Sequence, residues 1–294
     1  MSDKMKILKG GALPATKFVR LIVFGPTGGG KSTFGATMPG PRVVLATDAN
    51  AALPLERSYA EVPRIYMPPG EKDRRPDIFM QVESWAQVQE ALVWLEDNQE
   101  AYDSVIIDSA SILNELCKRE VLAERQASLS RSWSAAGKTN SQIESLDLKG
   151  WGTLGDRMDT TRFRMHKLAA HVLWICGYLP PKSARDDSSK AVKGGPDLSP
   201  GKQAIRFPYA CQASLYIERD VFPDGTSQVR LYSTMPDVDA KDNSGRLDGV
   251  EPPDAMVLLA RLGYLEPELA QQIIDLAPKR SAEEIVAGNL GLDL

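Results

Sequence analysis

Apolar, β-branched runs of strand length recur along the chain and are separated by segments with helical periodicity. The clearest runs are residues 18–24, 42–48, 104–109 and 171–177, and a weaker one covers residues 62–67. Runs of this length and composition predict strands that are buried in a sheet.

Three segments between these runs predict helices. Apolar side chains recur at helical spacing in residues 84–98 and 157–170, and residues 31–38 contain no proline before Pro39. The helices at 84–98 and 157–170 are expected to use their apolar positions for core packing. Strands that alternate with helices are typical of an α/β domain.

Composition places the chain among ordinary globular proteins and excludes disorder throughout. Of its 294 residues, 43% are hydrophobic and 25% are charged. No stretch reaches the length of a membrane span and no apolar signal segment follows the first residues, so a cytoplasmic protein without membrane contact is expected. The net charge of −4 means that any contact with nucleic acid must come from local basic clusters.

Residues 25–32 carry the sharpest chemical signal. They match the phosphate-binding pattern G-x-x-x-x-G-K-[ST], with a predicted strand before them and a predicted helix after them. Glycines let consecutive backbone N–H groups point into one concavity, where a polyphosphate fits. The residues expected to bind nucleotide are Gly25, Pro26, Thr27, Gly28, Gly29, Gly30, Lys31, Ser32 and Thr33.

ATP and Mg²⁺ are the cofactors that this loop predicts. Lys31 is expected to reach the β- and γ-phosphates, and the Ser32 hydroxyl to ligate Mg²⁺. The apolar run 104–109 ends in Asp108 and Ser109. A carboxylate at the carboxyl end of a central parallel strand lies beside such a loop, so Asp108 is the second expected magnesium residue.

Two basic stretches, near residues 118–150 and 180–202, are expected to be long, flexible loops. The second carries Lys182, Arg185, Lys190, Lys193 and Lys202 among Gly, Ser and Pro. Long loops in a compact domain usually have a use, and these five cations are candidates for binding DNA. A solvated insertion is the alternative, and for the second stretch the two interpretations stand level because Asp residues dilute its charge.

The order of these features resembles the RecA-like P-loop ATPases encoded by phages, including the Sak-type single-strand annealing recombinases. The resemblance covers roughly residues 17–250. It rests on the phosphate loop, the strand end at Asp48, the helix with Trp85, the segment 102–109, the strand 171–177 and the segment 196–202.

The resemblance implies a RecA-like P-loop NTPase core with a mostly parallel sheet, helices on both faces, and one strand between the phosphate-loop strand and the Asp108 strand. It implies that the two basic loops face single-stranded DNA and that subunits associate into a filament or ring, with a single-strand binding protein as a further possible partner. By position, Lys241 and Arg246 would then be cations supplied to a neighbour's ATP site; the alternative for both is a solvated hairpin or turn. A phage origin would place the protein in the host cytoplasm.

One departure from that family concerns hydrolysis. The family has an Asp-x-Glu sequence after the first helix, where its Glu activates the attacking water, but here residues 48–50 read Asp-Ala-Asn. Asn50 can orient water and cannot accept its proton, so Asp48 or Glu56 is a candidate substitute. A second departure is Tyr178, where the family places a polar sensor of the γ-phosphate.

Three domain segments and three functions are therefore considered. Residues 1–16 form an N-terminal arm, residues 17–250 the ATPase core, and residues 251–294 a small helical appendage. Helices are predicted in the appendage at 254–262 and 268–276, and a capping box at 281–284 predicts the start of a third helix. The favoured function is an ATPase acting on single-stranded DNA in phage recombination. The alternatives are a nucleotide-gated structural or regulatory module with little hydrolysis and, last, a small-molecule kinase.

Overall fold

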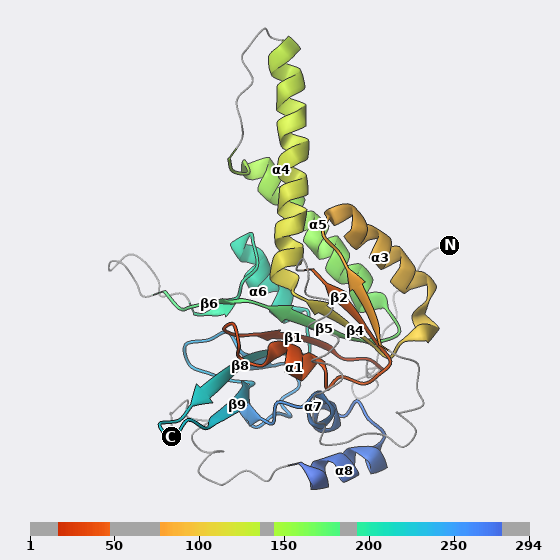
Figure 1. Ribbon diagram of the computed structural model, residues 1–294, viewed down its shortest axis with the longest axis vertical. Coiled ribbons are helices and arrows are strands. Elements are labelled where there is room, and N and C mark those ends of the chain that lie inside the picture. The colour runs from red at the N-terminus through yellow and green to blue at the C-terminus, as the bar shows by residue number, and fades with distance from the viewer. Residues whose placement is uncertain (1–16, 48–76, 136–143, 183–192, 278–294) are drawn as a thin grey trace, which may run out of the picture.

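A computed structural model describes residues 17–47, 77–135, 144–182 and 193–277. Its centre is a nine-stranded sheet in the order β11-β9-β8-β1-β5-β4-β2-β3, with β10 paired to β8 (Figure 1). The six strands from β8 to β3 run parallel to one another, and β9, β10 and β11 are antiparallel to their neighbours. The predicted α/β class with a mostly parallel sheet is confirmed.

The strands of this sheet are short and mostly buried. They are β1 (Arg20–Phe24), β2 (Arg42–Ala46), β3 (Ile78–Gln81), β4 (Ser104–Asp108), β5 (His171–Cys176), β8 (Ala213–Val221), β9 (Ser227–Tyr232), β10 (Lys241–Asp242) and β11 (Val250–Glu251). A separate two-stranded sheet pairs β6 (Tyr178–Leu179) with β7 (Gly195–Pro196). The predicted strands at 18–24, 42–48, 104–109 and 171–177 are confirmed as β1, β2, β4 and β5. The run 62–67 lies outside the described residues.

Helices cover both faces of the sheet (Figure 1). One face packs against α1 (Lys31–Gly35), α7 (Ala255–Leu262) and α8 (Pro267–Leu276). The other carries α3 (Trp85–Asp97), α4 (Ala110–Ala135), α5 (Leu148–Lys167) and α6 (Gly201–Tyr209), with the short 3-10 helix η2 (Gln99–Ala101) after α3. Because both faces are covered, every residue of β1, β2 and β5 is buried, which is why these strands read as continuous apolar runs.

α4 corrects the expectation of a flexible loop near residues 118–150. Residues 118–135 belong to this helix, whose far end stands clear of the sheet (Figure 1). The segment contains neither Gly nor Pro, and its many Ala, Leu, Glu and Arg residues favour helix. Two of its cations are also paired: Lys118 with Glu115 at 3.2 Å and Arg125 with Asp147.

α5 begins nine residues before the predicted start at residue 157. Asp147 explains this, because its side chain accepts a hydrogen bond from Gly150 N at 2.7 Å and so caps the first turn. Glycines in that first turn make it look like a loop in the sequence. The helix ends at Lys167, three residues before the predicted end.

α7 is part of the core. Its residues are buried from Ala255 to Ala260, and the Asp254 side chain accepts hydrogen bonds from Met256 N and Val257 N. Ala255 N donates to Thr37 Oγ1 at 2.7 Å, just beyond α1. The predicted helices 254–262 and 268–276 are thus present and pack on the core, while residues 281–284 lie outside the described part.

Arg20 and two histidines tie the amino end of the sheet to the end of α5. The Arg20 guanidinium donates to the carbonyls of His166 and Leu168, both at 2.8 Å, and to that of Ala170 at 2.5 Å. His166 Nε2 accepts from Trp174 Nε1 at 3.1 Å, and His171 Nδ1 accepts from Val19 N at 3.2 Å. Both rings therefore act as neutral acceptors.

Within the described ranges, no helix combines the length and the apolar character that crossing a bilayer requires.

The two buried histidines make stability depend on pH. Burial, reinforced by the charge of Arg20, lowers the pKa of His166 to about 3 and that of His171 to about 4, from 6.5. Below pH 6.5 the unfolded chain therefore binds protons that the folded chain does not, and stability falls as pH drops. We expect His171→Asn, which keeps an acceptor for Val19 N, to remove up to about 1.4 kcal/mol per pH unit of this dependence. Urea unfolding at pH 7 and pH 5 measures it, and an unchanged slope would contradict the assignment.

Candidate nucleotide-binding site

The phosphate loop joins the carboxyl end of β1 to α1 and packs tightly against β8. A Cβ atom on Gly25 would lie 1.9 Å from the Ile217 carbonyl oxygen, so only glycine fits there. Gly28 and Gly30 have φ values of 79° and 98°, in the left-handed region that glycine tolerates. The loop's shape therefore depends on β8 as well as on its own glycines.

Lys31 folds over this loop. Its Nζ donates to the carbonyls of Gly25 and Pro26 at 2.8 and 2.7 Å. Burial lowers the pKa of Lys31, and Asp108 acts in the opposite sense. The ammonium thus already lies at the mouth of the loop, where the phosphates of a nucleotide would offer it stronger acceptors.

Ser32 and Asp108 meet across the sheet. Ser32 Oγ donates to Asp108 Oδ2 at 2.7 Å, although β5 lies between β1 and β4. Beyond β4, Thr47 Oγ1 donates to Ser109 O and accepts from Ser109 N, both at 2.9 Å, which fixes the end of the strand. A hydroxyl and a carboxylate are oxygen donors of the kind that Mg²⁺ prefers when phosphates and water complete its shell, so this pair fits the ion.

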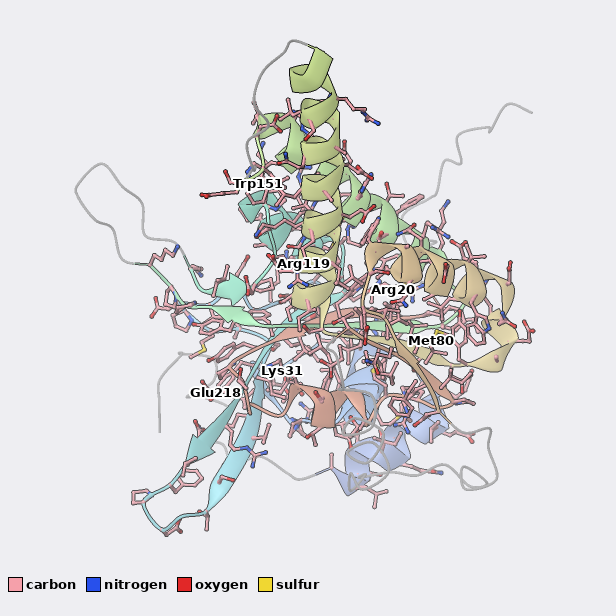
Figure 2. All side chains as sticks on the ribbon, turned by 45° about the horizontal axis from the view of Figure 1, so that its top comes forward. Arg20, Lys31, Met80, Arg119, Trp151 and Glu218 are labelled. Atoms are coloured by element: carbon pink, nitrogen blue, oxygen red, sulfur yellow. The ribbon has the colours of Figure 1, made fainter. Side chains whose placement is uncertain are left out.

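A hairpin that the sequence reading missed encloses the loop from the side of β8. A Cβ on Gly30 would contact Val229 of β9, and one on Gly29 would lie 3.5 Å from Glu218 Cα. Figure 2 shows Glu218 close to Lys31, whereas Arg119 lies with α4 across the sheet. The signal that could have found this hairpin is the Asp-Gly pair at residues 224–225 between two alternating segments.

Aromatic rings line the same end of the sheet. Phe24 stacks on Tyr178 with ring centroids 6.3 Å apart, and Tyr178 lies 5.0 Å from the Tyr216 ring. Tyr216 OH donates to Glu218 at 2.9 Å. Tyr178, the residue at the expected sensor position, is thus placed beside the loop strand by ring packing.

Lys241 and Arg246 lie at the opposite edge of the sheet. β10 pairs Lys241 with Ser214, near the amino end of β8, and Lys241 Nζ is 3.0 Å from the centre of the Tyr209 ring. Arg246 Nη1 donates to Leu262 O at 2.6 Å, at the end of α7. In their own chain, both cations are engaged away from the phosphate loop.

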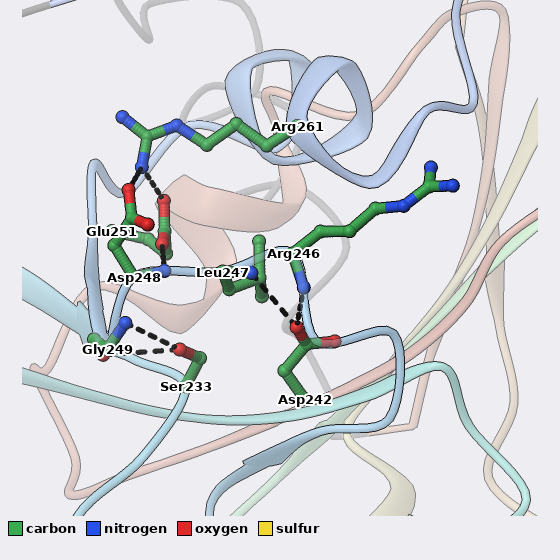
Figure 3. A network of polar contacts seen from close by, with 8 residues as sticks. All are labelled: Ser233, Asp242, Arg246, Leu247, Asp248, Gly249, Glu251 and Arg261. Atoms are coloured by element: carbon green, nitrogen blue, oxygen red, sulfur yellow. Dashed lines mark hydrogen bonds and ion pairs between the residues drawn. The ribbon is translucent and has the colours of Figure 1, made fainter. Parts of the chain in front are cut away.

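Asp242 holds the turn that carries Arg246 (Figure 3). Its Oδ2 accepts from the backbone N–H groups of Arg246 at 2.6 Å and Leu247 at 2.9 Å. Next to this turn, Arg261 donates to Glu251 at 2.6 Å. Together with the bond from Arg246 to Leu262 O and the ion pair of Arg261 with Asp248, these contacts hold the turn to the end of α7.

Three of the candidate DNA-binding lysines are described and exposed: Lys182, Lys193 and Lys202. They flank the β6–β7 pair and open α6, so they follow the carboxyl end of β5. The other predicted site residues Arg185, Lys190, Asp48, Asn50 and Glu56 lie outside the described residues.

A family model described as an AAA domain matches residues 17–244. The chain belongs to this AAA domain family. It is therefore a nucleotide-binding P-loop protein, and ATP with Mg²⁺ is the usual ligand pair of such domains. Among curated proteins, none matches the sequence. The matched range contains the phosphate loop, Asp108 and the β8–β9 hairpin, whereas Arg246 lies two residues beyond its end.

Gly25→Ala tests the packing of the loop on β8. The new methyl group would collide with the Ile217 carbonyl, so we expect a loss of about 1–3 kcal/mol in the free energy of unfolding and weaker ATP binding. Gly152→Ala is the matched control, because it faces open space in α5 and is expected to be neutral or stabilising. Denaturant unfolding and nucleotide titration measure both; equal stability of the two variants would contradict this packing.

Asp108→Asn tests the magnesium assignment. The amide keeps an acceptor for Ser32 Oγ but loses the charge, so ATP affinity in Mg²⁺ should fall about 10- to 100-fold. Affinity measured in a chelator should stay the same, because no ion is then bound. Equal losses under both conditions would show that Asp108 acts on the fold and not on the ion.

Proposed function

We propose that this AAA protein is a Mg²⁺-dependent ATPase that binds single-stranded DNA and acts in recombination or strand annealing of the phage Sak type. The observation that supports the proposal most is the course of the chain after β5. That strand lies between β1, which carries the phosphate loop, and β4, which ends in Asp108. The segment that follows β5 carries the exposed lysines.

The surface around this segment has the chemistry that single strands require. Lys202 begins the exposed face of α6, where 63% of the Arg206 side chain is exposed. Tyr209, which is 68% exposed, lies at the far end of the same helix, against Lys241. Cations bind the phosphates of a single strand, and exposed aromatic rings stack on its bases. Lys182 and Lys193 extend the positive charge along the β6–β7 pair.

The same segment can couple DNA to the nucleotide. Tyr178 begins β6 only two residues after the end of β5, and Ile175 in β5 pairs with Asp108. A single DNA strand bound to the β6–β7 segment would therefore act on the residues beside the γ-phosphate. Stimulation of ATP hydrolysis by DNA follows from this proximity.

Self-association into a filament or ring is part of the proposal. Lys241 and Arg246 lie at the sheet edge opposite their own phosphate loop, so head-to-tail contact could bring them near a neighbour's nucleotide. Arg246 would first have to release Leu262 O. A single-strand binding protein remains a proposed partner on the strength of the resemblance alone.

A nucleotide-gated regulatory module is the second candidate. Asn50, at the position where the resembling family carries a glutamate, favours slow turnover. Tight ATP binding without phosphate release, with or without DNA, would select this function. Transfer of phosphate from ATP to a small molecule would instead favour the third alternative, a small-molecule kinase.

The direct test is phosphate release with and without single-stranded DNA. We expect DNA to raise the rate in the native chain, and Lys31→Ala to abolish both basal and stimulated rates because the phosphates lose their cation. A native rate that DNA leaves unchanged, together with no DNA binding, would overturn the DNA role.

Lys193→Ala with Lys202→Ala locates the DNA surface. Each lysine that contacts a phosphate contributes about 0.7 to the slope of log affinity against log salt, so the double variant should lower the slope by about 1.4. Lys167→Ala is the control, since this exposed lysine ends α5 at the amino edge of β5. A loss of slope in the control and not in the double variant would contradict the assignment.

A further inference from the structure

The segment after β7 brings a carboxylate to the end of β5. Asp197 N donates to Gly177 O at 3.0 Å, directly beyond the last residue of the strand. Leu198 N donates back to Pro196 O at 3.0 Å, so the chain turns tightly there. The turn places Asp197 above a strand end that lies between the phosphate loop and Asp108.

α4 locks this turn in place. Ser111 Oγ donates to Asp197 O at 2.8 Å and accepts from Gly177 N at 2.9 Å. Asn114 Nδ2 donates to Ser199 O at 2.7 Å, and its Oδ1 accepts from Ser199 N at 3.0 Å. α4 begins two residues after Asp108, so the helix that holds the turn follows the predicted magnesium residue directly in the chain.

The Asp197 side chain lies over Gly177. A Cβ atom on that glycine would be 3.4 Å from Asp197 Cβ and 3.6 Å from Oδ2. Strand register puts Cys176 beside Phe24, the residue before the loop, and Ile175 beside Asp108. The carboxylate is therefore over the strand that separates the two halves of the nucleotide site.

The Asp197 carboxylate is free to accept a hydrogen bond or a proton. Asp197 is exposed, and its carboxylate has no hydrogen-bond or ion-pair partner within the described part of the chain. Burial raises the pKa of the Cys176 thiol beneath it, and the charge of Asp197 acts in the same direction while that of Lys31 opposes it. The contacts that fix the turn use the Asp197 backbone and not its side chain.

We propose that Asp197 is the carboxylate that orients and deprotonates the attacking water, in place of the glutamate that Asn50 replaces. The proposal rests on ATP hydrolysis as proposed above. The water oxygen forms a bond to the γ-phosphorus while the bond from that phosphorus to the bridging oxygen breaks. ADP leaves with the electron pair of that bond, and the proton of the water passes to Asp197 and then to solvent.

Asp197→Asn is the variant that tests this assignment. The amide matches the carboxylate in shape, and the backbone bonds to Gly177 and Ser111 do not depend on the charge, so the fold and ATP binding should persist. We expect kcat to fall on the order of 100-fold, the smaller end of the contribution of a general base, with the dissociation constant for ATP changed less than about twofold. Asp197→Glu should retain part of the rate.

Asp237→Asn is the matched control. Asp237 is also exposed, and its carbonyl accepts from Gly194 N at 2.8 Å beside the same segment, whereas the atoms nearest a Cβ on Gly177 belong to Asp197 and Ser111. This variant should keep the native kcat. Loss of kcat in both variants, or loss of ATP binding in Asp197→Asn, would overturn the proposal in favour of a structural role.

The outcomes separate this inference from the function on which it rests. A native chain that hydrolyses ATP alongside an Asp197→Asn variant of the same rate overturns the role of Asp197 and leaves the ATPase intact. If the rate of hydrolysis depends on Asp197 but is unchanged by DNA, the result supports the catalytic role of Asp197 and overturns only the DNA role. A native chain that binds ATP and never turns it over overturns both.

Discussion

The hydrogen bond from Ser32 Oγ to Asp108 is the contact on which the nucleotide site depends. It joins residues that follow β1 and end β4, two strands that do not touch because β5 runs between them. The bond can form only when all three strands keep their register, so the hydrophobic sheet sets the geometry of the polar site. Thr47, which clamps Ser109, holds the far side of the same arrangement.

Packing from outside the loop matters as much as the loop sequence. β8 approaches so closely that Gly25 has no room for a side chain, and Val229 of β9 lies against Gly30. On the opposite side of α1, Thr37 accepts a hydrogen bond from the first residue of α7. α7 thus supports the nucleotide site, and its apolar residues belong to the same core as β1.

The sequence predicted the parts of this protein that have strong local signals. The strands around the loop are continuous apolar runs, and the loop motif and Asp108 could be paired because strand ends meet at one edge of a parallel sheet. The part of α4 from residue 118 onward is not recognisable as a helix in the sequence because it has little apolar periodicity and many Ser residues. Asp197 and the β8–β9 hairpin could not be placed, since their positions come from contacts with Gly177 and Gly25 that are distant in sequence.

The most direct test of the central claim is a crystal structure with Mg²⁺ and a non-hydrolysable ATP analogue. The account predicts that Lys31 Nζ leaves the Gly25 and Pro26 carbonyls for phosphate oxygens, and that the ion replaces the direct bond between Ser32 and Asp108. A nucleotide bound elsewhere, or an intact Ser32–Asp108 bond with the ion held by other residues, would contradict it.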